Sequence, residues 1–162
     1  MNILDQEQRD IALKTLIYLC KGSRIEGLLF YGLRVLLSEN DHNGNRIDGQ
    51  ISINIENEFE VFPSMPEIPP PPKENHRRDL TESARKLCEL RLKKIVDIKL
   101  GREIPHLYLI FDTGEVLYIN GHHKDFESWQ VEVHNNTNLS DVFAVVACPG
   151  DNLATWAPED IV

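Results

Sequence analysis

Basic side chains are almost missing from the C-terminal third of the sequence. Residues 103–162 contain ten Asp and Glu residues but a single basic side chain, Lys124, whereas residues 1–102 hold 16 acidic and 16 basic side chains. This third therefore carries the whole formal net charge of −9. Phosphate backbones require the opposite charge, so nucleic acid is disfavoured as a ligand here and a basic protein partner is favoured. The alternative is an acidic face that only keeps the protein soluble.

Signals for membranes, export and disulfide bonds are also missing. No apolar run approaches the roughly 20 residues that a bilayer span needs. The N-terminal segment "MNILDQEQRD" is acidic and polar, whereas a signal peptide carries basic residues followed by an apolar block. Cys20, Cys88 and Cys148 are far apart and form no C-x-x-C pair, which favours reduced thiols. We therefore expect a cytoplasmic protein of 162 residues that does not contact membranes.

The sequence lacks the common signatures of enzymes. It has no Gly-rich phosphate loop, no dinucleotide fingerprint, no H-E-x-x-H motif and no zinc-ribbon cysteine pairs. The segment "DHNGNRIDG" is rich in oxygen ligands, but an EF-hand loop beginning at Asp41 would place Arg46 at its glycine position and Ser52 at its glutamate position. We expect no cofactor, no metal ion and no catalytic residue.

The triplet Asp112-Thr113-Gly114 is similar to the active-site triplet of aspartic proteases. Those enzymes need two Asp carboxylates that share a proton, and here the triplet occurs once and is followed by Glu115. A homodimer would supply a second Asp, so the protease remains an alternative. A tight hairpin turn is the favoured interpretation.

Two helices are indicated by capping boxes followed by apolar residues at helical spacing. Asp5 with Gln8 predicts a helix that ends near Gly22, and Asp79 with Glu82 predicts a second helix. The apolar positions of the two helices are Ile11, Ala12, Leu16, Leu19 and Cys20, and Leu80, Ala84, Leu87 and Cys88.

Most of the remaining sequence alternates apolar and polar residues, as strands do. Residues 27–37 fit a buried strand or a continued helix, and a strand from about Gly32 is the favoured interpretation. Asn43-Gly44 is the strongest hairpin signal after it. Residues 51–61 read as one strand, and short connections favour an antiparallel order for the later ones. The predicted fold is α+β, with two helices packed on a twisted, mostly antiparallel β-sheet (meander). Its later strands are expected at 93–100, 106–111, 115–120, 128–133 and 142–148, before a last short segment, "LATWAP".

The chain is expected to form a single domain, 1–162, with three subregions. Residues 1–62 provide the N-terminal helix and strands, 63–78 a proline-rich linker, and 79–162 a helix plus an antiparallel meander. The P-x-x-P spacing of the linker would also allow binding by an SH3-type domain. The two halves share an order of elements, with "FEVF" (59–62) corresponding to "WQVEV" (129–133), which suggests an internal duplication into two similar halves.

The stretch "GHHKDFESWQ", residues 121–130, concentrates polar and aromatic side chains. On an extended backbone His122 and His123 point to opposite faces and do not share a metal ion; on a turn they could, with His134 as the third ligand. We interpret the stretch as a hairpin connection whose Phe126 and Trp129 anchor the sheet. Its polar side chains then face water and provide a binding surface.

Residues 92–133 contain two patterns: Phe111 and Gly114 belong to L-x-L-x-F-x-x-G-x-x-L, and Phe126-Glu127-Ser128-Trp129 matches [YF]-E-S-W. In these patterns the segment resembles small bacterial β-meander domains that occur among immunity proteins of polymorphic toxin systems. The resemblance implies a protein-binding domain, an immunity protein that neutralises a basic toxin such as a nuclease by steric and electrostatic blocking. The family supplies no catalytic residues.

The predicted partner-binding residues combine carboxylates that mimic phosphate charge with two anchors, Trp129 and His122. The whole set is Asp112, Glu115, His122, His123, Asp125, Glu127, Trp129 and Glu132. Two alternatives remain: a metal- or His-dependent enzyme built from His122, His123, Asp125 and His134, and a regulatory or structural module of a larger assembly. The sequence leaves the oligomeric state open.

Overall fold

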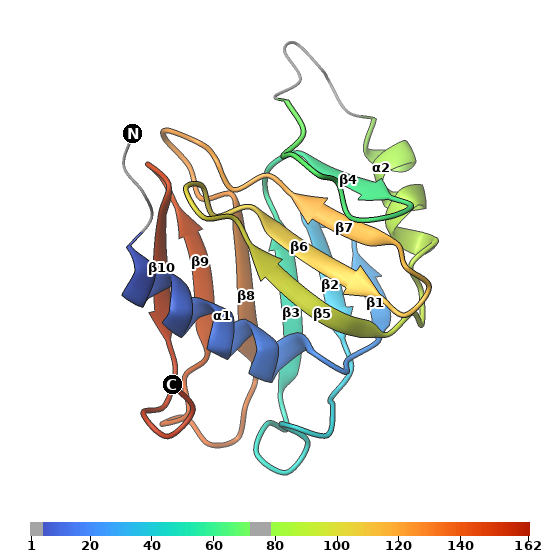
Figure 1. Ribbon diagram of the computed structural model, residues 1–162. Helices are drawn as coiled ribbons and strands as arrows, with labels where there is room; N and C mark the ends of the chain where they lie inside the picture. Colours follow the sequence, from blue (N-terminus) through green and yellow to red (C-terminus); the bar gives the residue numbers. More distant parts are fainter. Residues whose placement is uncertain (1–4, 72–78) are drawn as a thin grey trace.

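The strands form two antiparallel sheets, accompanied by two helices (Figure 1). The computed structural model describes residues 5–71 and 79–162. The first sheet has the strand order β1-β2-β3-β8-β9-β10 and the second the order β4-β7-β6-β5. The elements are α1 (Gln6–Cys20), β1 (Ile25–Leu29), β2 (Leu33–Leu37), β3 (Gln50–Ile55), β4 (Phe59–Phe62), α2 (Leu80–Cys88), β5 (Ile95–Leu100), β6 (Leu107–Phe111), β7 (Val116–Ile119), β8 (Trp129–His134), β9 (Ala144–Cys148) and β10 (Asn152–Trp156).

The two sheets stack as layers, and α1 extends the layer of the smaller sheet. Figure 1 shows β4 to β7 in front of β1 to β3, while α1 crosses in front of β8, β9 and β10. α1 also contacts β5, the neighbouring edge of the smaller sheet. Between the layers lie fully buried side chains from both sheets and α1, among them Leu16, Ile53, Leu109, Phe111 and Trp129. The predicted α+β class is confirmed, but the strands divide into two sheets where the sequence suggested one.

Side-chain caps define both helices, as the capping boxes predict. The carboxylate of Asp5 accepts the N–H of Gln8 at 3.0 Å, and that of Asp79 accepts the N–H of Thr81 at 2.8 Å. At its other end α1 is capped by the long β2–β3 connection. Asn43 lies there fully buried and donates its amide to the Tyr18 carbonyl at 2.9 Å. This segment, rejected above as a calcium loop, thus satisfies carbonyls that the helix leaves without partners.

The two halves of the chain repeat one topology and exchange their fourth strands. β1-β2-β3 and β5-β6-β7 are both antiparallel meanders. β4 then pairs with β7, with Phe59 opposite Ile119, and β8 pairs with β3, with Trp129 opposite Ile55. Phe59 and Trp129 therefore occupy equivalent positions, which is the correspondence that the sequence suggested between "FEVF" and "WQVEV". The two similar halves are present in the fold, and β9 and β10 are additions to the second half.

The halves meet at a symmetric junction beside Arg24 and Lys94, which form an antiparallel bridge. The N–H of Gly22 donates to the Ile95 carbonyl at 2.8 Å, and the N–H of Leu92 donates to the Ile25 carbonyl at 2.7 Å. A register shift follows in each half, after Ile25 in β1 and after Ile95 in β5. The repetition therefore extends from strand order to single hydrogen bonds.

Several predicted strands differ from the observed ones. The single strand expected over 51–61 is wrong, because the chain leaves the larger sheet after Ile55 and enters the smaller one at Phe59. The strand expected from Gly32 is the second arm of a hairpin whose first arm is β1. Of the linker, residues 63–71 contain no helix or strand, and 72–78, with His76, lie outside the described residues. None of the helices in the described ranges is long and apolar enough to cross a membrane.

Candidate functional site

The predicted partner-binding residues do not share one surface. Asp112 and Glu115 lie in the β6–β7 turn, whereas His122, His123, Asp125 and Glu127 lie in the β7–β8 connection. These two segments are at opposite ends of β7, whose four residues span about 13 Å. Glu132 belongs to β8 in the other sheet and approaches His134 at 3.4 Å. The acidic third is therefore divided among several places.

The two aromatic residues of "GHHKDFESWQ" have different environments. Trp129 is fully buried and donates its indole N–H to the Pro105 carbonyl at 2.9 Å. It anchors the sheet as predicted, but its proposed role as a partner-binding residue is wrong because no part of it reaches the surface. Phe126, predicted to anchor the sheet, is 67% exposed, and its ring centroid lies 5.0 Å from that of His123. Phe126 is thus the exposed aromatic residue of the connection.

Carboxylates of the β6–β7 turn are engaged within the protein. Glu115 forms an ion pair with Lys93 and accepts the Thr113 hydroxyl at 3.0 Å. The hydrogen bond from Lys93 lowers the pKa of Glu115. Asp112 accepts the backbone N–H of Lys94 at 3.3 Å. The triplet beginning at Asp112 thus forms a hairpin turn, in which Gly114 has a φ of 91°.

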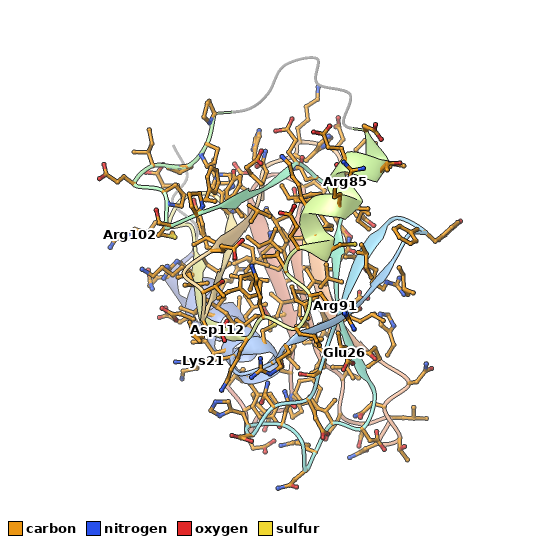
Figure 2. The ribbon with its side chains drawn as sticks, turned by 90° about the vertical axis from the view of Figure 1, so that its right-hand side faces the viewer. Lys21, Glu26, Arg85, Arg91, Arg102 and Asp112 are labelled. Carbon is orange, nitrogen blue, oxygen red and sulfur yellow. The ribbon has the colours of Figure 1, made fainter. Side chains whose placement is uncertain are left out.

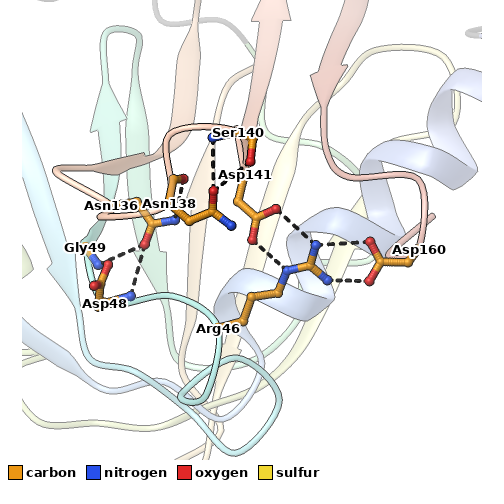
Figure 3. A network of polar contacts seen from close by, with 8 residues as sticks. All are labelled: Arg46, Asp48, Gly49, Asn136, Asn138, Ser140, Asp141 and Asp160. Atoms are coloured by element: carbon orange, nitrogen blue, oxygen red, sulfur yellow. Dashed lines mark hydrogen bonds and ion pairs between the residues drawn. The ribbon is translucent and has the colours of Figure 1, made fainter.

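A second group of carboxylates, those of Asp141 and Asp160, shares one guanidinium, that of Arg46 (Figure 3). The guanidinium bridges Asp141, at 2.8 Å from Nε to Oδ2, and Asp160, at 3.0 Å from Nη2 to Oδ1. Hydrogen bonds from Arg46 lower the pKa of both carboxyl groups. Arg46 thereby ties the β2–β3 connection to the segments that follow β8 and β10. Both carboxylates are thus engaged within the protein, and Arg46 offsets one of their two negative charges.

Three further carboxylates of the C-terminal third, those of Asp125, Glu127 and Asp151, belong to a region where three connections meet, at the upper left of Figure 1. We call this region the loop end: residues 56–58, 120–128 and 149–151. His122 Nδ1 lies 2.7 Å from Asp151 Oδ1, and the Asn57 amide donates to the His122 carbonyl at 2.8 Å. The N–H of Gly150 donates to the His123 carbonyl at 3.1 Å. The β7–β8 connection is therefore fixed on both sides by its neighbours.

His123 orders the tip of the connection. Its Nδ1 accepts the backbone N–H groups of Asp125 at 3.0 Å and Phe126 at 3.1 Å. The side chains of Asp125 and Glu127 flank Phe126 in the sequence, and within residues 5–71 and 79–162 neither has an ion-pair partner. The charge of Glu127 adds to burial in raising the pKa of Cys148, which places this carboxylate near the end of β9. In the sequence, an exposed ring thus stands between two carboxylates that have no ion-pair partner in the described part of the chain.

A buried histidine that the sequence did not single out supports the loop end. His106 Nδ1 accepts the N–H of Gly121 at 3.0 Å and lies 3.2 Å from the Tyr118 hydroxyl. Burial lowers the pKa of His106 to about 4, so the imidazole is neutral at physiological pH. Gly121 is required at this close approach, since a Cβ there would meet the Pro105 carbonyl oxygen at 2.0 Å. In the sequence His106 shows only as the first residue of an expected strand.

The residues of the enzyme alternative are not brought together. His134 is the last residue of β8, while His122 and His123 precede the first, so the length of that strand separates them. The Ser128 hydroxyl accepts the Asn57 amide at 3.1 Å. Among the residues that the structure describes, no group of three or more His, Cys, Asp or Glu side chains is arranged to hold a metal ion.

Comparison with known proteins adds no relative: no family model, no curated protein and no solved structure matches the chain.

Proposed function

We propose that the chain is a small protein-binding domain of the immunity type, and that the loop end binds and blocks a basic partner such as a nuclease toxin. The observation that carries the proposal is the tip of the β7–β8 connection. There Phe126, 67% exposed, lies between Asp125 and Glu127, which have no ion-pair partner in the described part of the chain.

The charge of the loop end supports a basic partner. Its three segments hold one basic side chain, Lys124, and five acidic ones, Glu56, Glu58, Asp125, Glu127 and Asp151. Carboxylates that are already paired, such as those around Arg46, would lose an internal partner on binding. Asp125 and Glu127 do not have that cost, so they contribute attraction and a faster encounter with a cationic surface.

The shape of the loop end supports binding by a preformed surface. Aromatic anchors surrounded by polar groups are typical of the residues that dominate binding energy. His122 and His123 act here mainly as braces, because their contacts with Asp151 and with the Asp125 and Phe126 N–H groups hold the tip in place. A rigid loop loses little conformational entropy on binding. Asp112, Glu115 and Glu132 are excluded from this surface by their positions.

A toxicity-rescue assay tests the proposal. The candidate toxin is the product of the gene adjacent to the gene for this chain. Its expression in a host cell is expected to stop growth, and co-expression of the chain is expected to restore it. The triple variant Asp125→Asn, Phe126→Ala, Glu127→Gln should fail to rescue. The matched control removes exposed carboxylates outside the loop end, Asp41→Asn and Glu159→Gln, and should rescue like the wild type. Equal rescue by both variants would contradict the loop end as the binding surface.

A further inference from the structure

Four strands of the described chain lie at sheet edges: β1 and β10 in the larger sheet, and β4 and β5 in the smaller one. An edge strand exposes backbone N–H and C=O groups with which another strand can pair. Natural proteins protect such edges with charged side chains, β-bulges or covering segments. β1, β4 and β5 carry charges or bulges, whereas β10 has neither, so the four edges are not equivalent.

The three protected edges differ from β10 in identifiable ways. The register shifts after Ile25 in β1 and after Ile95 in β5. The start of β1 is also covered, because the N–H of Leu92 donates to the Ile25 carbonyl at 2.7 Å. Figure 2 faces the β1 side of the molecule and shows the charged side chain of Glu26 there. β5 is flanked by α1, and β4 contains the charged residue Glu60.

β10 is a regular strand without a charged residue or a proline, with the sequence NLATW. All five of its residues pair with β9 in an unbroken register. No other strand within residues 5–71 and 79–162 pairs with its outer side. The edge is therefore straight and uncharged, as the addition of a further strand requires.

The hydrogen bonds of β9 determine which backbone groups of β10 face outward. The N–H of Val133 donates to the Phe143 carbonyl at 3.3 Å, next to the β8–β9 ladder. Bonded pairs recur at every second residue of an antiparallel ladder, so Val145 directs its N–H and C=O toward β8 and Val146 directs its own toward β10. The partner of Val146 in β10 is Ala154, whose backbone groups therefore face inward.

The outward groups consequently belong to Leu153 and Thr155, on either side of Ala154, the middle residue of the strand. When β10 pairs antiparallel with β10 of a second copy, Leu153 of each copy faces Thr155 of the other and exchanges two hydrogen bonds with it. Ala154 then meets its own counterpart at the two-fold axis, and Trp156, 52% exposed, lies opposite Asn152. Identical charged strands would place like charges together in this arrangement, but β10 has none, so a second copy fits its edge.

We propose that β10 is the interface of a homodimer, in which the six-stranded sheets of two copies join edge to edge into one continuous antiparallel sheet. Asp151, the carboxylate nearest to the strand, lies 2.7 Å from His122 within its own copy, so it adds little repulsion. β10 begins at the loop end. The two loop ends therefore lie at opposite ends of the joined strands and stay apart. The proposal does not rest on the proposed function.

Disulfide trapping of the full-length chain tests this register. Ala154→Cys places two cysteines in a non-hydrogen-bonded pair, whose Cα atoms are about 4.5 Å apart and thus within reach of a disulfide. In a Cys88→Ser background, which removes an exposed native thiol, this variant should form a covalent dimer under mild oxidation, with the bond located by mass spectrometry.

Trp156→Cys in the same background is the matched control. Position 156 is more exposed than position 154, but in the proposed register its two copies are about 13 Å apart, four residues along the strand. It should therefore cross-link at least tenfold more slowly than position 154. Equal cross-linking at the two positions would overturn the proposal, because it would show random collisions and no fixed register.

Sedimentation equilibrium supplies a second, non-covalent readout. The wild-type protein should be dimeric at tens of micromolar. Thr155→Pro removes an outward N–H that β9 does not use, which an edge strand tolerates, so this variant should be monomeric with an unchanged circular dichroism spectrum. Thr155→Val keeps the N–H and should remain dimeric. A wild-type protein that stays monomeric at these concentrations, or a dimer that persists in Thr155→Pro, would contradict the pairing of β10.

Discussion

Gly22 and Leu92 occupy equivalent positions in the two halves of the fold and share a left-handed backbone. Their φ angles are 93° and 64°, and each donates its N–H across the junction, to Ile95 and Ile25 respectively. Glycine adopts this conformation at little cost, whereas a residue with a Cβ is strained there. Leu92 therefore stores strain that its counterpart Gly22 avoids.

Relief of this strain gives the first prediction. Leu92→Asn should raise the free energy of unfolding by about 1 kcal/mol, because Asn tolerates the left-handed region better than Leu. Leu92 is 51% exposed, so little apolar burial is lost. Gly22→Ala should lower the free energy of unfolding by about 1 kcal/mol for the opposite reason. Urea denaturation at neutral pH measures both changes, and stabilisation by Gly22→Ala would contradict the assignment.

Exchange of β4 and β8 predicts that neither half folds alone. Each half supplies the fourth strand of the other sheet, so an isolated half leaves both a sheet edge and Phe59 or Trp129 without their partners. Fragments divided between residues 75 and 76 should be unfolded separately and should form a one-to-one folded complex when mixed. Circular dichroism and size-exclusion chromatography report both states. A cooperative thermal transition in either fragment alone would be inconsistent with the exchange.

Local patterns explain why much of this fold was predictable. The capping carboxylates of Asp5 and Asp79 and the alternation along Ile51, Ile53 and Ile55 act within a few residues, so the sequence reveals helices and strands directly. The change of sheet between Ile55 and Phe59 is set by contacts with β7 and β8, far along the chain. The alternation of apolar and polar residues alone does not reveal this change of sheet.

The candidate site was predictable only in part, for a related reason. The sequence indicated that residues 121–130 form a polar connection, and His122, His123, Asp125 and Glu127 do lie there. It did not reveal that Lys93 and Arg46, distant in sequence, engage Glu115, Asp141 and Asp160. The net charge counted for residues 103–162 alone therefore overstated the acidic surface that is free to bind a partner. Trp129 was predicted to reach the surface, yet it is buried. A strand residue faces either the core or solvent, and an aromatic side chain is compatible with both faces, so the sequence alone did not decide between them.

Burial of His106 predicts a specific pH dependence. Its pKa is about 4 in the folded protein against an ordinary value of 6.5, so between these values only the unfolded chain takes up the proton. The free energy of unfolding should therefore fall as the pH decreases from 6.5 to about 4. The variant His106→Gln should show a smaller loss over this range, although it is less stable at neutral pH. Urea titrations at pH 7, 5.5 and 4.5 measure the two slopes, and equal slopes would show that His106 is not buried as a neutral imidazole.

The most direct test of the loop end is the salt dependence of its affinity for the protein encoded beside this chain. Isothermal titration at 50 and 200 mM salt should give at least tenfold weaker binding at the higher salt for the wild type. The variant Asp125→Asn, Glu127→Gln should bind more weakly at 50 mM salt and should lose most of this dependence, while Asp41→Asn, Glu159→Gln behaves as the wild type. An affinity that is the same at both salt concentrations, or unaffected by the Asp125 and Glu127 substitutions, would contradict recognition of a basic partner by the loop end.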